Sequence, residues 1–486
     1  MEVRVRYAPS PTGRQHVGNF RSAFFNYLFA RAKGGKFIIR LEDTDRTRFA
    51  EEYVQNLYDT LRWLGIDWDE GPDIGGPYAP YVQSERLALY KEHAEKLVAM
   101  GKAYYCFCDE ERLERIRKIQ TASKIALGYD RHCRSLAKDE IEANLKAGKP
   151  YVIRLNIPLE GSTQFHDKLL GDITWKNEDV SPDPVLLKSD GFPTYHLANV
   201  VDDHYMKITH IMRAQEWIPS TPMHVIMYEA FGWEHPEYCH LPMVMGQDGH
   251  KLSKRHGATS INEFRSGGYL PEALRNYVGM LGASYEDGRD IYPLSDMEKL
   301  FKVERLNKAP AVFDYKKLEW FNGQYIRMKT DAELMSMVMP FVFAAGIVRE
   351  SPSAEEQAKL EGAMPLIKER LRFLSEAPDM LRFLFSEVAV PAAEEMIPKR
   401  LDAAATKALL SKAAELLKAN GLSNLEATEA AFRSAADAAG AKLGDMLMPL
   451  RMAVTGTRVS PPLFESIRLL GLPKAMERVE RALAAL

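Results

Sequence analysis

A turn near the N-terminus combines glycine, proline and histidine in an arrangement suited to binding phosphate. A short β-type run at residues 3–7, which alternates apolar and charged residues, leads into this turn, and His16 and Gly18 then precede a helical pattern. Unpaired N–H groups and the dipole at a helix N-terminus attract anions. His16 is therefore a candidate donor to a phosphate, and Gly18 would let a nucleotide ring approach the backbone. An ordinary strand-to-helix turn with a solvated histidine is the alternative.

A second candidate for phosphate chemistry is a loop bounded by glycines at residues 249–257, which contains Lys251, Lys254 and Arg255. Lysines in a mobile loop can close on the β- and γ-phosphates of a nucleotide and neutralise charge as pyrophosphate leaves. Taken alone, a basic run of this kind is more often a solvated surface loop.

Three cysteines form a third candidate site. Cys106 and Cys108 are separated by one residue, and Cys133 follows in the same region. Clustered thiols in a reducing compartment indicate zinc more readily than a disulfide. Three unligated cysteines in a small hairpin are the alternative. Cys239 is isolated, and we expect it to be a core residue.

The elements that must position these residues follow from the apolar patterns. β-type runs at residues 3–7 and 37–41 alternate with helical patterns that begin near Gly18 and Glu51. This order predicts βαβ units around a parallel sheet. Residues 151–157 resemble a further strand, and we interpret roughly 85–190 as an insertion into the α/β domain.

The composition changes near residue 325. All six tryptophans precede residue 321, whereas residues 401–486 are rich in alanine and leucine and contain two aromatic residues, Phe432 and Phe464. Apolar residues at helical spacing from Leu409 to Leu417 end at Gly421, a typical helix stop signal. The part of the chain after the change is therefore predicted to be all-helical.

The composition also excludes several classes of protein. The chain has 486 residues, of which 46% are hydrophobic and 27% charged, as in globular proteins with several domains. A net charge of −3 argues against a uniform cationic coat, so nucleic acid would need local patches. No apolar run reaches the roughly 18 residues of a membrane span, and residues 337–348 are expected to form a buried helix. We expect a cytoplasmic protein that does not bind membranes.

The turn and the basic loop together resemble the HIGH and KMSKS signatures of class I aminoacyl-tRNA synthetases, with QHVGN at 15–19 and KLSKR at 251–255. Further segments resemble the bacterial glutamyl-tRNA synthetase family over nearly the whole chain. These are VRYAPSPTG at 5–13, RLEDTDR at 40–46, FPTYHLANVVDDH at 192–204, RAQEW at 213–217, PLRMAVTG at 449–456 and SPPLF at 460–464. Asn19 replaces the last HIGH histidine, Gln15 replaces the usual leucine, and Gln215 occupies a position that is often acidic.

The resemblance implies a pocket whose charges match glutamate, which has two carboxylates and an ammonium group. By similarity, Arg6 and Arg213 pair with carboxylate, Tyr195 donates to the side-chain end and Glu42 holds the α-ammonium. An ion pair between Arg6 and Glu42 is the alternative. The implied glutamate-binding residues are Arg6, Ala8, Ser10, Glu42, Tyr195, Asn199 and Arg213. The implied ATP-binding residues are His16, Gly18, Glu216, Trp217, Lys251, Ser253 and Lys254.

The implied reaction needs no protein nucleophile. The glutamate carboxylate attacks the α-phosphate of ATP, and the glutamyl group then passes to the terminal adenosine of tRNA(Glu). Catalysis is expected from positioning and from charge stabilisation by His16, Lys251, Lys254 and Mg²⁺. The resemblance also implies that bound tRNA is required for amino-acid activation.

Two further sites are implied by similarity. The family's zinc pattern that ends in Tyr-x-x-x-Cys fits Cys106, Cys108, Tyr129 and Cys133, with His132 as a possible substitute for Tyr129. For the anticodon, the basic candidates are Lys368, Arg370, Arg372 and Arg382, which are interleaved with Leu371, Phe373 and Phe383. Arginine can read a base edge or a phosphate while aromatic neighbours stack. By similarity, Arg370 lies near where bacterial relatives read the third anticodon base, although an amphipathic helix surface is the commoner explanation for any single residue.

The expected layout has four parts. Residues 1–84 and 191–245 form a Rossmann-like catalytic domain, 85–190 an inserted α/β acceptor-binding domain, 246–325 the KMSKS loop and stem-contact region, and 326–486 a helical anticodon-binding region. We expect a monomer. The rivals are a glutaminyl enzyme, which should have a β-rich C-terminal half, a truncated relative that glutamylates a tRNA base, a HIGH-type nucleotidyltransferase and a silent RNA-binding paralogue.

Overall fold

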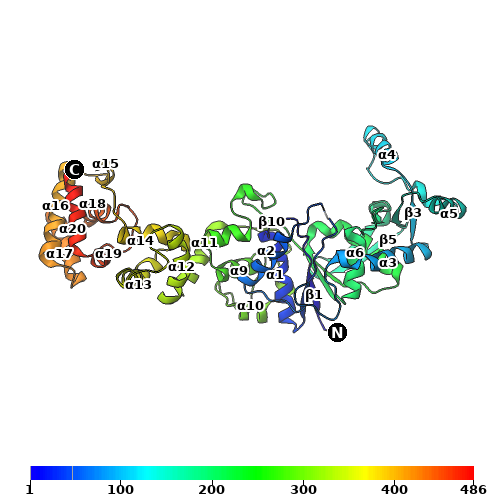
Figure 1. Ribbon diagram of the computed structural model, residues 1–486, viewed down its shortest axis with the longest axis horizontal. Helices are drawn as coiled ribbons and strands as arrows, with labels where there is room; N and C mark the ends of the chain where they lie inside the picture. The colour runs from blue at the N-terminus through cyan, green and yellow to red at the C-terminus, as the bar shows by residue number, and fades with distance from the viewer. Residues whose placement is uncertain (1, 46) are drawn as a thin grey trace. The chain divides into compact units, whose positions relative to one another are not determined.

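The computed structural model describes residues 2–45 and 47–486 and divides into two compact units (Figure 1). The first unit comprises Met1–Phe264 and Arg275–Asp314, and the second comprises Arg265–Leu274 and Tyr315–Leu486. Arg46, the last residue of the segment at 40–46, lies outside the described residues. Residue 325, where the composition changes, falls inside helix α11 (Tyr315–Arg327) of the second unit.

The first unit begins with the predicted parallel βαβ arrangement. Strand β1 (Arg4–Tyr7) pairs in parallel with β2 (Lys36–Ile39), and α1 (Val17–Ala32) connects them. Apolar residues recur along α1 at helical spacing and are buried. Helix α2 (Glu51–Trp63) follows β2. Because the strands are parallel, the residues that follow them lie at the same edge.

A four-stranded sheet with the order β6-β5-β9-β8 forms another part of the first unit. Strands β8 (His210–Ala214) and β9 (Glu237–Leu241) are parallel and are joined through α7 (Thr221–Phe231). The hairpin of β5 (Ser162–Asp167) and β6 (Gly171–Lys176) joins β9. Since this hairpin belongs to residues 85–190, part of the expected insertion extends the sheet.

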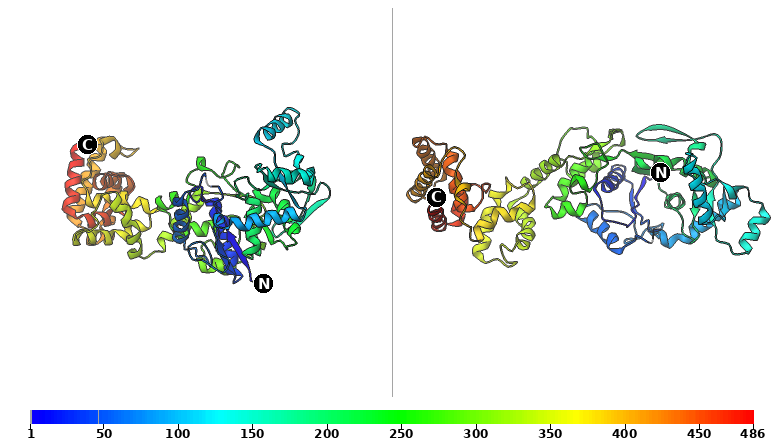
Figure 2. Two further views of the ribbon diagram at one scale, coloured as in Figure 1. Left: turned by 45° about the vertical axis from the view of Figure 1, so that its right-hand side comes forward. Right: turned by 90° about the horizontal axis from the view of Figure 1, so that it is seen from above.

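The rest of the insertion has its own three-stranded antiparallel sheet, made of β3 (Ala103–Cys106), β4 (Val152–Leu155) and β7 (Val185–Leu187). Strand β4 lies within the predicted strand at 151–157. Buried residues of this sheet and of α3 (Leu87–Ala99) share one core with α6 (Tyr195–Tyr205) and α7. The insertion is therefore continuous with the first unit in its packing. Figure 2 shows α4 (Glu110–Ala122) projecting away from the sheets, and α5 (Lys138–Lys146) follows it.

Short elements complete the first unit and lead to its border. They are β10 (Val244–Met245), the 3₁₀ turn η5 (Lys254–His256), α8 (Ile261–Ser266), α9 (Pro271–Gly279), α10 (Leu294–Leu300) and β11 (Ala311–Val312). Strands β10 and β11 pair in parallel.

The part of the second unit after residue 314 contains helices and no strand among its described residues, which confirms the all-helical prediction. After α11 its helices are α12 (Asp331–Ala344), α13 (Ala354–Lys368), α14 (Ala377–Phe385), α15 (Ala393–Met396), α16 (Ala403–Asn420), α17 (Leu425–Ala438), α18 (Leu443–Thr455), α19 (Leu463–Leu470) and α20 (Leu472–Ala485).

Local signals explain where these helices begin and end. Capping boxes at Thr330 and Ser353 start α12 and α13 by satisfying free N–H groups. Gly421 follows the last residue of α16, as predicted. Helix α12 buries Val338 and Val342 but ends at Ala344, so only the first part of the range 337–348 forms the expected buried helix.

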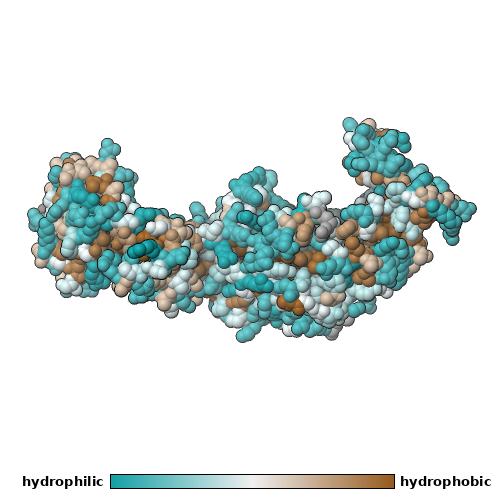
Figure 3. All heavy atoms as spheres, in the orientation of Figure 1, coloured by the Kyte–Doolittle hydropathy of each residue, from teal (hydrophilic) through white to brown (hydrophobic). Residues whose placement is uncertain are grey.

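Within the described part of the chain, no helix is both long and apolar enough to cross a membrane. On the face shown in Figure 3, hydrophobic residues are scattered among hydrophilic ones.

Candidate active site

A cleft of about 570 Å³ lies at the carboxyl ends of β1, β2 and β8 in the first unit. Ligands commonly bind at this edge of a parallel sheet because loops from different strands converge there. The cleft brings together predicted residues that are far apart in the sequence. Those that line it are Arg6, Ala8, Ser10, Glu42, Tyr195, Arg213, Glu216 and Trp217.

The other predicted residues do not line this cleft, namely His16, Gly18, Asn199, Lys251, Ser253 and Lys254. Asn199 lies behind it, fully buried. Its amide oxygen accepts hydrogen bonds from Arg6 at 3.0 Å and Arg40 at 3.3 Å. Its amide nitrogen has no hydrogen-bond partner among the described residues. Asn199 therefore lies behind the residues of the cleft and holds Arg6 and Arg40 in position.

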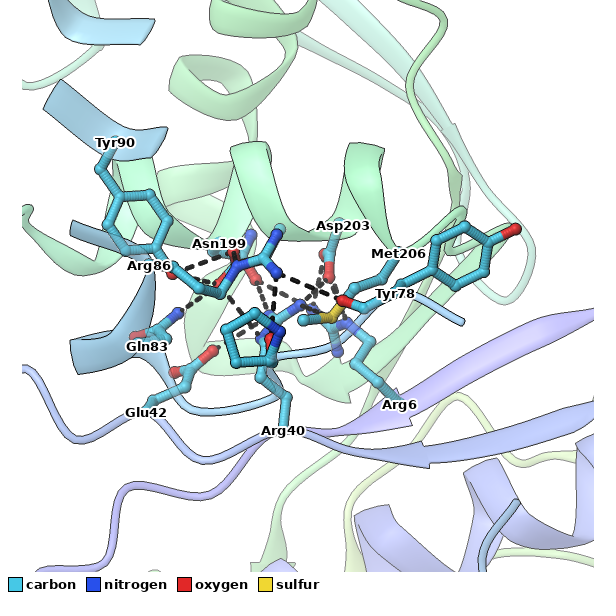
Figure 4. Close-up of polar contacts among 12 residues, drawn as sticks. Arg6, Arg40, Glu42, Tyr78, Gln83, Arg86, Tyr90, Asn199, Asp203 and Met206 are labelled. Carbon is cyan, nitrogen blue, oxygen red and sulfur yellow. Dashed lines mark hydrogen bonds and ion pairs between the residues drawn. The ribbon is translucent and has the colours of Figure 1, made fainter. Parts of the chain in front are cut away.

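Arg6 is bound to a carboxylate of the protein itself. Its Nε lies 3.0 Å from Asp203 Oδ1, and its Nη2 lies 3.1 Å from Asp203 Oδ2 (Figure 4). Glu42 pairs with Arg40 at 3.1 Å, so the ion pair considered between Arg6 and Glu42 is not formed. Nη1 of Arg6 has no hydrogen-bond partner among the described residues, and this is the group left for a ligand.

Sequence reasoning missed the buried ionic network on which Arg6 depends. Arg40 contacts Asp203 at 2.6 Å, and Arg86 contacts Asp202 at 2.7 Å. Tyr90 also donates to Asp202, at 2.9 Å. Figure 4 shows these side chains converging on α6 from β1, the segment after β2, and α3. Two adjacent aspartates in the otherwise apolar pattern of α6 were the available signal, because buried acids require partners.

The charges of this network set the ionisation of its acids. Burial opposes ionisation of Asp203, but the charges and hydrogen bonds of Arg6 and Arg40 outweigh it, and the pKa of Asp203 lies below its ordinary value. At Glu42 burial prevails over Arg40 and Arg6, and the pKa is raised. A cationic group that binds beside Glu42 would favour its ionised form.

Arg213 differs from the other buried arginines of the site because no described carboxylate pairs with it. It is 6% exposed. Its guanidinium donates to His240 Nε2 at 3.2 Å, to Thr221 Oγ1 at 2.9 Å and to Tyr195 Oη at 3.3 Å. This cation at the wall of the cleft therefore keeps a charge that the surrounding side chains do not neutralise.

The glycine turn pairs through its backbone with residues 259–261, which follow the basic loop. Val17 N donates to Thr259 O at 2.9 Å, and Ile261 N donates to Gln15 O at 3.0 Å. His16 and Ser260 thus form an antiparallel bridge. The turn therefore lies beside the end of the basic loop, and the charges of Lys251 and Lys254 act on His16.

His16 is held in one tautomer by the helix that it caps. Its Nδ1 accepts a hydrogen bond from Gly18 N at 3.0 Å, which leaves the ring proton on Nε2. Burial, followed by the positive charge of Lys251, lowers the pKa of His16. The imidazole is therefore neutral near pH 7 and can donate from Nε2.

The cysteines form the predicted cluster. The sulfur atoms of Cys106, Cys108 and Cys133 lie within 4.8 Å of one another. The Tyr129 hydroxyl lies 3.3 Å from Cys106 Sγ and 3.4 Å from Cys108 Sγ. Ligand atoms about 2.3 Å from a tetrahedral zinc ion are roughly 3.8 Å apart, so these four groups suit such an ion. His132 is exposed and outside the cluster.

Two arginines lie beside the thiol cluster, and one of them, Arg112, also pairs with Asp130 at 2.6 Å. Arg112 Nη1 lies 3.4 Å from Cys108 Sγ, and the Arg154 guanidinium lies 3.8 Å from the centre of the Tyr129 ring. Cations favour the thiolate form that binds metal. Cys239 is 1% exposed, as expected for a core residue.

The basic residues proposed for the anticodon differ in whether an acidic side chain pairs with them. Lys368 pairs with Asp331 at 2.6 Å and Arg372 with Glu376 at 2.8 Å. Arg370 is exposed and forms no ion pair among the described residues. Burial of Arg451 lowers its pKa, and the charge of Arg370 lowers it further. Arg451 is not among the residues predicted from the sequence.

Of the two aromatic neighbours expected to stack, Phe373 and Phe383, the expectation is wrong for Phe383. Leu371 is fully buried and Phe383 is 3% exposed, so neither can stack on a base. Phe373 is half-buried and packs against Tyr269, with ring centres 4.8 Å apart. The apolar residues of this segment form the helical core because their spacing places them inside.

Two protein-family models match the chain. The model described as "tRNA synthetases class I (E and Q), catalytic domain" matches residues 2–320. The model described as "Anticodon binding domain" matches residues 333–483. Together they cover both compact units.

Curated relatives match over their full lengths. A glutamate–tRNA ligase of Treponema denticola is 63% identical, covering 100% of this chain and 99% of the relative. One from Borreliella burgdorferi is 52% identical, over 99% and 98%. A solved glutamate tRNA ligase from Elizabethkingia meningosepticum, in complex with its amino acid, covers 100% of both chains at 34% identity with a TM-score of 0.88.

Proposed function

The chain belongs to the glutamate–tRNA ligase family of class I tRNA synthetases, and we propose from this premise which of its residues perform the reaction. The activity is ATP-dependent ligation of L-glutamate to the terminal adenosine of tRNA(Glu) through a glutamyl-adenylate. The rivals fit less well. The C-terminal half is helical rather than β-rich, and it matches an anticodon-binding model that a small-molecule nucleotidyltransferase would not need.

Arg213 is proposed to bind the side-chain carboxylate of glutamate. The observation that carries this proposal is a 6% exposed arginine at the cleft with no acidic partner among the described residues. A desolvated guanidinium strongly favours a carboxylate over a neutral amide. Tyr195 Oη, 3.3 Å from Arg213 Nη1, is placed to donate to the same carboxylate.

Arg6 and Glu42 are proposed to bind the α-substituents of the amino acid. Nη1 of Arg6 faces a carboxylate oxygen, while Asp203 and Asn199 hold the rest of its guanidinium. Glu42 binds the α-ammonium, whose charge favours the ionised carboxylate. Ala8 and Ser10 line the same part of the cleft.

The first chemical step is attack by the glutamate α-carboxylate on the α-phosphate of ATP, with pyrophosphate as the leaving group. His16 donates from Nε2 to the α-phosphate, and Lys251 and Lys254 approach the β- and γ-phosphates, with Ser253 between them. Gly18, Glu216 and Trp217 contact the nucleoside. Mg²⁺ supplied with ATP neutralises phosphate charge. Catalysis is positioning and electrostatic stabilisation.

In the second step a ribose hydroxyl of the terminal adenosine attacks the glutamyl carbonyl and displaces AMP.

Arg370 is proposed to contact the anticodon. Cys106, Cys108, Tyr129 and Cys133 are proposed to hold a structural zinc ion that fixes the base of α4, and a closed four-ligand site of this kind stabilises local folding. We propose a monomer that acts in the cytoplasm.

Aminoacylation by the wild-type chain and by Arg213→Ala tests the proposed site. Purified tRNA(Glu) and tRNA(Gln) are each offered with glutamate or glutamine. We expect wild type to charge glutamate, and Arg213→Ala to lose kcat/KM for glutamate by about 10²-fold or more, since a buried charge partner is removed. A variant that keeps the wild-type ratio of glutamate to glutamine would transfer discrimination to Arg6 and Tyr195. The tRNA(Gln) arm measures whether the chain charges one tRNA or both.

A further inference from the structure

Among the described residues, the hydrogen-bond partners of the Arg213 guanidinium are all neutral side chains. Nε donates to His240 Nε2 at 3.2 Å, Nη2 to Thr221 Oγ1 at 2.9 Å, and Nη1 to His224 Nδ1 at 3.3 Å. An arginine has five N–H donors in a rigid plane, so three contacts on three different nitrogens fix both its position and its tilt. A carboxylate in this shell would have fixed the plane equally well but would have neutralised the charge.

A carboxylate lies on the far side of His240, so the imidazole separates it from Arg213. Asp167 Oδ2 lies 2.7 Å from His240 Nδ1 and accepts a hydrogen bond from His240 N at 2.9 Å. Both side chains are fully buried. The other oxygen of Asp167 accepts from Leu169 N and Leu170 N, each at 2.9 Å. The carboxylate is therefore anchored on both oxygens by the turn of the β5–β6 hairpin.

This arrangement determines which nitrogen of His240 carries its proton. The ionised carboxylate of Asp167 accepts a hydrogen bond from Nδ1–H of His240, so Nε2 carries a lone pair and accepts from Arg213. Hydrogen bonds from His240 and from the backbone outweigh the effect of burial at Asp167, and its pKa is lowered. Burial lowers the pKa of His240, which keeps the imidazole neutral.

His224 completes the shell in the same way. Its Nδ1 accepts from Arg213, and its Nε2 lies 3.0 Å from His196 Nδ1, so Nε2 is the donor of that pair. Burial, followed by the charge of Arg213, places the pKa of His224 well below its ordinary value. Two imidazoles thus act as acceptors on Arg213 without carrying charge.

We propose that Asp167 and His240 are positioning residues that orient Arg213 toward the side-chain carboxylate of glutamate and thereby set the selectivity for glutamate over glutamine. The proposal rests on the proposed function of Arg213. Neither residue lines the cleft, so each acts through Arg213. The arrangement supplies rigidity to a cation at the cleft while the balancing negative charge stays on the far side of an imidazole.

A pair of substitutions at one position separates positioning from simple packing. In His240→Asn the amide reaches the place of Nδ1, so the contact with Asp167 can persist while the acceptor for Arg213 is lost. In His240→Gln the amide oxygen reaches the place of Nε2 and can accept from Arg213. The matched control is His210→Asn. His210 begins strand β8, which also carries Arg213 near its other end, and His210 does not line the cleft.

The readouts are KM for glutamate, KM for ATP, the ratio of kcat/KM for glutamate and glutamine in aminoacylation of tRNA(Glu), and the thermal midpoint. We expect His240→Asn to raise KM for glutamate about 10- to 100-fold, because a small misplacement of a binding group has effects of this size. The same variant should reduce the preference for glutamate over glutamine, measured as the ratio of the two kcat/KM values, and should leave KM for ATP unchanged. His240→Gln should recover most of the loss, and His210→Asn should match wild type.

Arg213→Ala is included so that the two proposals can fail separately. If Arg213→Ala loses selectivity while His240→Asn retains wild-type KM and ratio, the positioning role is wrong and the role of Arg213 stands. If Arg213→Ala itself retains the wild-type ratio, the proposed function of Arg213 is wrong. Equal losses in His240→Asn and His240→Gln with a lowered thermal midpoint would assign His240 to packing and would also overturn the proposal.

Discussion

Lys251 Nζ lies 2.7 Å from Glu216 Oε2, so one lysine of the basic loop is paired with a carboxylate that lines the cleft. Both side chains are about half exposed, and pairs of this kind contribute little free energy, on the order of 0–1 kcal/mol. Lys251 can therefore exchange Glu216 for a phosphate at small cost. Lys254, on the same loop, forms no side-chain hydrogen bond or ion pair among the described residues.

The first prediction concerns Lys254→Ala. Because the Lys254 side chain makes no hydrogen bond or ion pair in the described part of the chain and acts on Glu263 only through its charge, the fold and the affinity for tRNA should change little. ATP–pyrophosphate exchange, measured with tRNA(Glu) present, should slow by about 10²–10³-fold, the usual effect of removing one donor that stabilises transition-state charge.

Arg255→Ala is the matched control for this substitution. Arg255 is the next residue of the loop, and its guanidinium pairs with Asp248 at 3.0 Å. Its removal should reduce exchange far less. Equal effects at the two positions would mean that only the total charge of the loop matters, and wild-type exchange by Lys254→Ala would remove this lysine from the mechanism.

The second prediction is about one zinc ion per chain. Protein purified without added metal should contain zinc near a one-to-one ratio by elemental analysis, because three thiols and a hydroxyl converge within bonding reach of one ion. Cys108→Ser should lower the zinc content strongly. KM for ATP should change little in this variant, since the thiol cluster and the cleft share no lining residue.

Cys239→Ser is the comparison for the zinc measurement, because Cys239 is a buried cysteine outside the cluster. It should retain the metal. A wild-type ratio near zero under non-chelating conditions would favour three unligated cysteines. Retention of zinc by His132→Ala together with its loss by Tyr129→Phe would identify the fourth ligand as Tyr129.

The third prediction is a loss of stability at mildly acidic pH. Burial, followed by the charge of Lys207, lowers the pKa of His204 to about 4. The unfolded chain binds a proton at this histidine near pH 6.5, whereas the folded chain does so only near pH 4. Stability from neutral His204 is therefore complete above pH 6.5 and is lost as the pH falls toward 4.

His204→Gln tests this pH dependence. Between pH 7.5 and pH 5.5, wild type should lose about 1 kcal/mol more unfolding free energy than the variant, as judged from denaturant midpoints. Stacking of His204 on Trp233, with ring centres 3.7 Å apart, makes the variant less stable at every pH, so the slope and not the absolute value is the measure. Parallel slopes would show that His204 does not titrate in this range.

The local parts of this fold were predictable from the sequence. The βαβ unit follows from alternating apolar patterns, and the helix that ends before Gly421 follows from apolar spacing and a glycine stop signal. Periodicity of this kind reports the conformation of neighbouring residues. The cysteine cluster was also predictable, because its three members lie in one region of the sequence.

Pairings between distant segments could not be predicted in this way. Asp203 binds Arg6, and Asp167 lies behind His240, yet periodicity carries no information about which buried acid meets which base. The β5–β6 hairpin joins β9 through a single register pair, Asp167 with Tyr238. Family resemblance supplied residues that line the cleft, but the buried residues that hold them in place are apparent only in the folded structure.

The last prediction concerns the anticodon. Arg370 is exposed and forms no ion pair among the described residues. Arg451 lies close enough for the two guanidinium charges to interact unfavourably, which contributes, after burial, to the lowered pKa of Arg451. Arg451 is held by the carbonyl of Pro461 at 2.9 Å. Neither cation is paired with an acid in the described part of the chain, so the two form a local positive patch in a chain of net charge −3, as RNA binding requires.

Arg370→Ala should therefore raise KM for tRNA(Glu) by about tenfold, since one specific contact to a base or phosphate contributes roughly 1–3 kcal/mol. KM for glutamate and for ATP should not change. Arg382→Ala is the control, because Arg382 is about half exposed and lies 3.7 Å from Asp379. A tRNA(Glu) altered at the third anticodon base then distinguishes reading from attraction. Wild type should discriminate against the altered tRNA more strongly than Arg370→Ala does. If both variants weaken tRNA equally and discriminate as wild type does, Arg370 contributes charge alone, and the base must be read by another residue.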